Sequence, residues 1–97
     1  MKKITCSPGD IISELVGDSE ASRYIIVAKG VSVDYRDVEY TVYKGYIIYV
    51  CEQWRELHKV GTTWLIDEQQ IEAGALTLKK VFESNLSWEG YNVENEF

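Results

Sequence analysis

The sequence predicts an α+β fold, in which an antiparallel β-meander of four to six strands packs on one C-terminal helix. Between Tyr24 and Cys51, Tyr, Ile and Val alternate with polar residues, which is typical of strands with one buried face. After Asp67 the apolar residues recur at helical spacing instead. A small curled sheet that approaches a barrel is the alternative. We expect residues 1–97 to form a single domain, because a chain of this length holds one core.

The first element is a short N-terminal helix, predicted over residues 8–16. Ser7 suits the N-cap, Pro8 suits the first helical position, and Asp10 complements the helix dipole. The competing interpretation is a strand over residues 11–16, because Ile and Val favour sheets. The apolar residues at helical spacing and the glycine that follows them are Ile11, Ile12, Leu15, Val16 and Gly17.

Three turns divide the predicted meander. Glycines mark a three-residue turn at residues 28–30 and a second turn at residues 44–45. Between them the alternation slips by one residue, which a two-residue turn at residues 36–37 or a bulge in one long strand explains equally well. The strand at residues 46–51 is apolar on both faces, so we expect it to be central or covered on both sides.

The second half of the chain begins with a helical turn or an extended hairpin arm at residues 52–59, followed by a final strand at residues 62–66. The C-terminal helix is predicted over residues 68–84. Asp67 is its expected N-cap, and Gln70 completes a capping box. Its apolar stripe consists of Ile71, Ala75, Leu78 and Phe82.

The net charge of −6 limits the kinds of partner that the chain can bind. Residues 81–97 contain four glutamates and no Lys or Arg. An acidic chain repels phosphate and anionic membranes, so we expect no direct binding to nucleic acid or membrane and a basic partner instead. No apolar segment follows the N-terminal lysines, and no apolar run approaches the roughly 20 residues of a membrane span. We therefore expect a cytoplasmic protein with two free thiols.

No catalytic, metal-binding or cofactor-binding motif is present, so the sequence predicts a non-catalytic protein without metal or cofactor. His58 is the only histidine and has no second histidine to share a metal or a proton-transfer role. Cys6 precedes the predicted first helix and is a better candidate for a reactive thiol than Cys51. Burial as an inert thiol is nevertheless the favoured interpretation for both cysteines.

The candidate contact residues are aromatic and acidic. Most tyrosines of the meander are interpreted as cross-strand packing, because the meander is nearly neutral and lacks the positive groove of a nucleic-acid platform. Tyr43 and Tyr46 are the exception and are expected to form an exposed contact pair. The segment after the second helix is either a partner-binding segment or an acidic edge strand. Its candidate residues are Glu83, Trp88, Glu89, Tyr91, Glu94, Glu96 and Phe97.

Together these observations predict a small acidic protein–protein interaction module, an inhibitor or accessory protein that blocks a basic, nucleic-acid-binding surface of a larger target. One version is nucleic-acid mimicry, as in phage-type anti-defence proteins, where carboxylates imitate phosphates. The alternative is a small-molecule-binding or enzymatic domain with a pocket between sheet and helix, using His58, Glu56, Cys51 and Tyr49. A homo-oligomer built through the acidic edge is a third interpretation, although like charges would meet across its axis.

Overall fold

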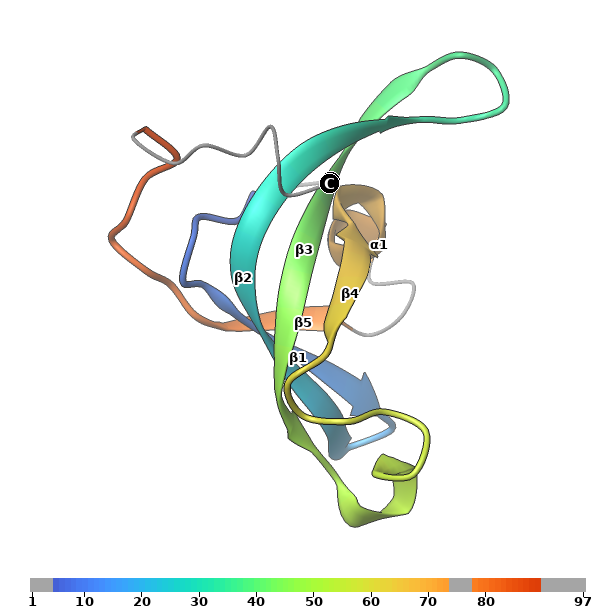
Figure 1. Ribbon diagram of the computed structural model, residues 1–97, viewed down its shortest axis with the longest axis vertical. Coiled ribbons are helices and arrows are strands. Elements are labelled where there is room, and N and C mark those ends of the chain that lie inside the picture. Colours follow the sequence, from blue (N-terminus) through green and yellow to red (C-terminus); the bar gives the residue numbers. More distant parts are fainter. Residues whose placement is uncertain (1–4, 74–77, 90–97) are drawn as a thin grey trace.

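The computed structural model describes residues 5–73 and 78–89 and shows a mostly β protein (Figure 1). Its five strands form one antiparallel sheet in the order β4-β3-β2-β1-β5, which confirms the antiparallel sheet and lies within the predicted number of strands. A 3-10 helix, η1, follows β3, and a short helix, α1, follows β4. The elements are β1 (Ile11–Val16), β2 (Ser19–Val33), β3 (Glu39–Val50), η1 (Glu52–Trp54), β4 (Thr63–Asp67), α1 (Glu68–Ala73) and β5 (Leu78–Phe82).

The predicted N-terminal helix at residues 8–16 is wrong, and the competing strand over residues 11–16 is confirmed as β1. β1 lies between β2 and β5 and pairs with both, so its backbone groups are satisfied by two neighbouring strands. Asp10 caps no helix, because its Oδ2 accepts a hydrogen bond from the Ser7 N–H at 2.8 Å in the preceding turn. Gly17, at φ +63°, lies in the turn to β2.

The long ribbon of β2 and β3 replaces four predicted shorter strands. The turns expected at residues 28–30 and 44–45 are wrong, because both strands continue through these glycines. Gly45 instead permits close packing, since a Cβ there would lie 3.0 Å from the Tyr24 Cβ and 2.9 Å from the Ile66 Cδ1. The turn expected at residues 36–37 is confirmed as part of a longer loop that joins Val33 to Glu39.

The second helix is much shorter than predicted. α1 ends at residue 73, and residues 78–82 form β5 beside β1, so a helix over residues 68–84 is wrong. The expected cap is present, because the Asp67 Oδ1 accepts a hydrogen bond from the Gln69 N–H at 2.8 Å. The strand predicted at residues 62–66 is confirmed as β4, but β5 follows it. Residue 75 of the predicted stripe lies outside the described residues.

The strands form a curved sheet (Figure 1). One half-buried tryptophan from η1 and one from the C-terminal loop pack against the core. β3 is an internal strand between β2 and β4, but β4 pairs only with its residues 42–46, so the expectation that residues 46–51 are central or covered on both sides is met only where the two strands overlap. Its convex side is open to solvent, since Tyr46 and Ile48 are exposed. The buried cluster consists of Cys6, Ile12, Tyr24, Ile26, Tyr43, Ile47, Val50, Ile66, Ile71 and Leu78.

Buried polar groups attach the N-terminal segment to the sheet. The fully buried Asp10 carboxylate accepts a hydrogen bond from the Ser84 N–H at 2.6 Å and lies 3.3 Å from the Lys80 Nζ. The Tyr43 hydroxyl accepts a hydrogen bond from the Cys6 N–H at 3.0 Å and donates one to Glu68 on α1. These hydrogen bonds and the Asp10–Lys80 ion pair join segments that are distant in the sequence, and they hold the N-terminal segment against the sheet.

Candidate functional site

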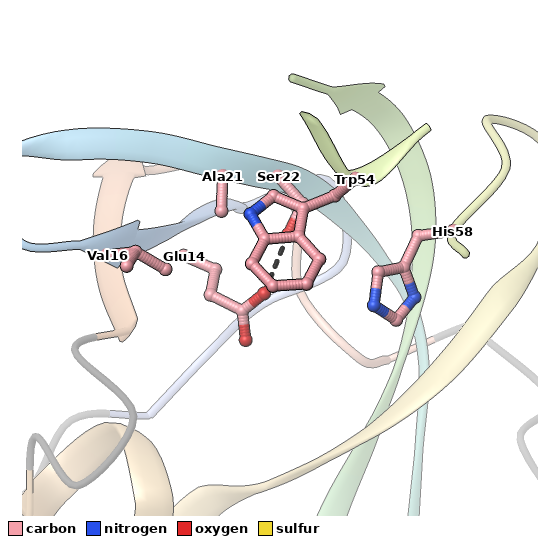
Figure 2. Close-up of a pocket in the computed structure, with 6 residues that line it drawn as sticks. All are labelled: Glu14, Val16, Ala21, Ser22, Trp54 and His58. Atoms are coloured by element: carbon pink, nitrogen blue, oxygen red, sulfur yellow. Dashed lines mark hydrogen bonds between the residues drawn. The ribbon is translucent and has the colours of Figure 1, made fainter. Parts of the chain in front are cut away.

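A groove on the concave face is the best-formed candidate site. Two hollows of about 190 and 270 Å³ share Glu14 and His58 in their walls, and we treat them as one site, the Glu14 groove. Figure 2 shows the Glu14 carboxylate and the Trp54 and His58 rings turned toward the first hollow. The residues on which its chemistry depends are Glu14, Ser22, Tyr24, Trp54, His58 and Trp64.

The register of the sheet places the polar groups of the groove. Glu14 on β1 pairs with Ser22 on β2 and with Leu78 on β5, and laterally paired residues point to the same face. Tyr24 lies two residues beyond Ser22, so it shares this face. The sheet therefore presents one carboxylate and two hydroxyls side by side, above the apolar core.

The aromatic walls come from the other edge of the sheet. Trp54 ends η1, and the His58 N–H donates to the Trp54 carbonyl at 2.9 Å, which holds the two rings in one turn after β3. The His58 ring meets the Trp64 ring of β4 edge to face, with the centroids 4.8 Å apart. The His58 Nδ1 is buried and makes no hydrogen bond with any residue that the structure describes. Residues that the chain separates by ten positions thus form one side of the groove.

The two oxygens of the Glu14 carboxylate have different surroundings. Oε1 accepts a hydrogen bond from the Ser22 hydroxyl at 2.9 Å and a longer one from the Tyr24 hydroxyl at 3.4 Å. Burial is the main cause that raises the pKa of Tyr24, so this phenol stays a donor at neutral pH. Oε2 has no hydrogen-bond partner among the described residues, and no cationic side chain among them pairs with Glu14. The groove therefore holds an acceptor open to a cation.

The exposed tyrosine pair expected from the sequence is only half present. Tyr46 is 40 % exposed on the convex face, as expected. Tyr43 is 1 % exposed, so its expected exposure is wrong. It pairs with Ile66 on the core side of the sheet, and its hydroxyl bonds to Cys6 and Glu68 hold it there. Tyr43 is a core residue of this fold.

Of the C-terminal candidates, the structure describes Glu83, Trp88 and Glu89. The Trp88 indole donates to the Cys6 carbonyl at 2.9 Å, and the Lys29 Nζ lies 5.2 Å from the centre of its ring, so Trp88 is docked on the domain. Glu83 is exposed near Lys80, and Glu89 is exposed in the following turn. Figure 1 shows residues 83–89 at the left of the view and the acidic loop at residues 34–38 at the upper right. Tyr91, Glu94, Glu96 and Phe97 lie outside the described residues.

The groups of the alternative pocket are likewise dispersed. His58 lines the Glu14 groove, Cys51 lines another hollow that shares Trp54 with it, and Glu56 is exposed. Burial raises the pKa of the Cys6 thiol from 9.0 to about 12, so the expectation that Cys6 is the more reactive thiol is wrong. Its predicted helix N-terminus is absent, since residues 11–16 are a strand.

No protein-family model, curated protein or solved structure matches this chain. Among the described residues, no cluster of His, Cys, Asp and Glu has the arrangement of a metal site, and no helix has the length and apolarity to cross a membrane. The fold and the site are those of a small antiparallel-sheet protein with an acidic groove between tryptophan walls. Its function has to be argued from that geometry.

Proposed function

We propose that this protein is a non-catalytic protein–protein interaction module that binds a positively charged side chain of a larger partner in the Glu14 groove. The observation that carries the proposal is the Glu14 Oε2, an open carboxylate oxygen with no cationic partner among the described residues. A carboxylate that is partly removed from water attracts a cation strongly, because the local dielectric is low. The faces of Trp54 and Trp64 add cation–π attraction.

The groove has room for a basic side chain in either of its two hollows. They measure about 190 and 270 Å³, and Glu14 lines both of them. A Lys or Arg side chain that enters either hollow therefore meets the Glu14 carboxylate in its wall. The net charge of −6 attracts a basic partner over a longer range, so charge and groove favour the same kind of target.

Blocking a basic surface follows from this mode of binding. The protein would insert no residue of its own but would capture a cationic side chain that the partner needs elsewhere, for instance for contact with phosphate. Residues 83–89 and the loop at residues 34–38 lie apart (Figure 1), which favours such capture over mimicry of a row of phosphates.

The proposal is tested with three capped tripeptides of the form Gly-X-Gly, where X is lysine, arginine or the neutral norleucine. The indole N–H signals of the ¹⁵N-labelled protein report on the groove. We expect a basic probe to shift the Trp54 and Trp64 signals while norleucine does not, with Trp88 as an internal reference. Glu14→Gln should abolish the shifts, and the matched control Glu39→Gln, which removes an exposed charge on β3, should retain them. Shifts that survive Glu14→Gln, or no shift with either basic probe, would contradict the proposal.

A further inference from the structure

Glu14 offers a ligand one carboxylate oxygen, Oε2, and this determines whether a lysine or an arginine side chain binds more tightly. We infer that the Glu14 groove selects lysine over arginine, because Ser22 and Tyr24 already occupy the Oε1 atom. Lysine selection rests on the proposed function of the groove. A guanidinium achieves its strength with carboxylates through two parallel hydrogen bonds, one to each oxygen. An ammonium is a compact point charge and needs one acceptor in any direction.

The two hydroxyls that occupy Oε1 are held firmly. Ser22 and Tyr24 are both buried, and their own oxygens lie 3.0 Å apart. Ser22 is also fixed in the middle of the sheet, since it pairs with Glu14 on β1 and Val50 on β3. An incoming guanidinium could reach both oxygens of Glu14 only by displacing these donors from Oε1. Ser22 and Tyr24 are therefore the specificity-determining residues.

The rest of the groove suits a lysine side chain. Ile66 and Leu78 line its floor and offer apolar surface to an unbranched four-carbon stem, and Trp64 flanks them. The Gln70 side chain lines the same hollow and offers an amide oxygen to a second ammonium proton. The Trp54 and Trp64 rings can take the remaining face of the cation. Acetylation of the partner lysine would remove the charge and the attraction with it.

A free polyamine carries the same ammonium chemistry as a lysine side chain. The proposal commits to lysine in a protein, because the groove holds one open carboxylate oxygen among the described residues, and a second ammonium on the same ligand would find no second carboxylate in the walls. Spermidine is therefore a discriminating probe rather than an expected ligand.

The test compares affinities of the capped lysine, Nε-acetyl-lysine and arginine tripeptides for the wild-type protein and for Ser22→Ala. We expect the lysine peptide to bind the wild type about tenfold more tightly than the arginine peptide, the effect of one charge-assisted hydrogen bond. Nε-Acetyl-lysine should not bind. Ser22→Ala should bring the lysine-to-arginine ratio close to one by improving arginine binding, a gain that a general loss of structure cannot produce.

Tyr24→Phe provides a second route to the same result if Ser22→Ala disturbs the fold, because it keeps the ring and removes the other donor. Equal wild-type affinities for lysine and arginine, or a ratio that neither variant changes, would overturn lysine selection and leave the proposed function standing. Spermidine binding more than tenfold tighter than the lysine peptide would overturn lysine as the source of the ammonium. Absence of binding by every basic probe would overturn both the inference and the proposed function.

Discussion

Replacement of Tyr43 by phenylalanine should weaken the fold strongly, although the ring is retained. The hydroxyl accepts a hydrogen bond from the Cys6 N–H and donates one to Glu68, and all three residues are buried. Leaving a buried polar group without its partner costs about 1 to 3 kcal/mol. Glu68 has a further interaction, so the cost of its lost hydrogen bond lies at the lower end of this range. We expect Tyr43→Phe to lower the free energy of unfolding by about 2 to 4 kcal/mol.

The assay is urea unfolding followed by tryptophan fluorescence and far-ultraviolet circular dichroism, with coincident transitions and an unchanged m-value as the test for two-state behaviour. The matched control is Tyr46→Phe, which removes the same atom from an exposed tyrosine three residues away on the same strand. Its effect should stay within about 0.5 kcal/mol. A loss below about 0.5 kcal/mol for Tyr43→Phe would refute the hydrogen-bonded position of Tyr43 in the core.

Three further predictions concern the buried polar groups and the thiols. Asp10→Ala should lower the free energy of unfolding by about 3 kcal/mol or more in urea titrations, because the Lys80 ammonium loses its buried partner; a loss below about 1 kcal/mol would contradict this. Burial raises the pKa of Cys6 from 9.0 to about 12, so the stability that the buried neutral thiol contributes is complete below pH 9 and is lost as the pH rises toward 12. The urea midpoint should therefore fall more steeply above pH 9 in the wild type than in Cys6→Ala. In thiol titration with an aromatic disulfide, Cys51 should react in the folded protein and Cys6 only after unfolding; equal rates would contradict the buried position of Cys6.

Period-two alternation was sufficient to predict the antiparallel sheet, because half-buried strands carry this pattern wherever they lie. It could not decide the N-terminal element. Ile11, Ile12, Leu15 and Val16 fit either a helix or a strand, and the decision came from β2 and β5, which pair on both sides of this segment. Pairing with β5 is a contact across more than sixty residues, which local signals do not contain.

The C-terminal helix is a second case: local signals predicted where it begins but not where it ends. Asp67 correctly marked its start, because capping is a local interaction. The end of the helix could not be predicted locally, because residues 78–82 pair with the free edge of β1 and form β5. Leu78 would be buried in a helix and is buried in the strand, so its apolar character does not distinguish the two. Gly45 was interpreted as a turn residue, whereas the structure needs its missing side chain for close contact with Tyr24. Propensity cannot distinguish these two uses of glycine.

The candidate site was hardest to predict from the sequence. His58 is predicted only as part of the alternative pocket, Tyr24 is interpreted as cross-strand packing, and no motif marks Glu14 or Ser22 as a site residue. A usable signal was present, because in a strand over residues 11–16 Glu14 shares the core face with Ile12. A carboxylate on that face needs a partner or a ligand. The prediction of a helix over residues 8–16 concealed this pattern. The positions of the two tryptophans depend on how the loop between β3 and β4 folds, which no local pattern predicts.

The measurement that tests the central claim most directly is the set of nuclear Overhauser effects between the bound lysine tripeptide and the labelled protein. If the Glu14 groove binds the ammonium, the ε-methylene protons of the peptide lysine should show contacts to the Trp54 and Trp64 indoles, and these contacts should vanish in Glu14→Gln. Contacts confined to Trp88, or contacts to the groove that persist in Glu14→Gln, would contradict a carboxylate-directed binding site in this groove.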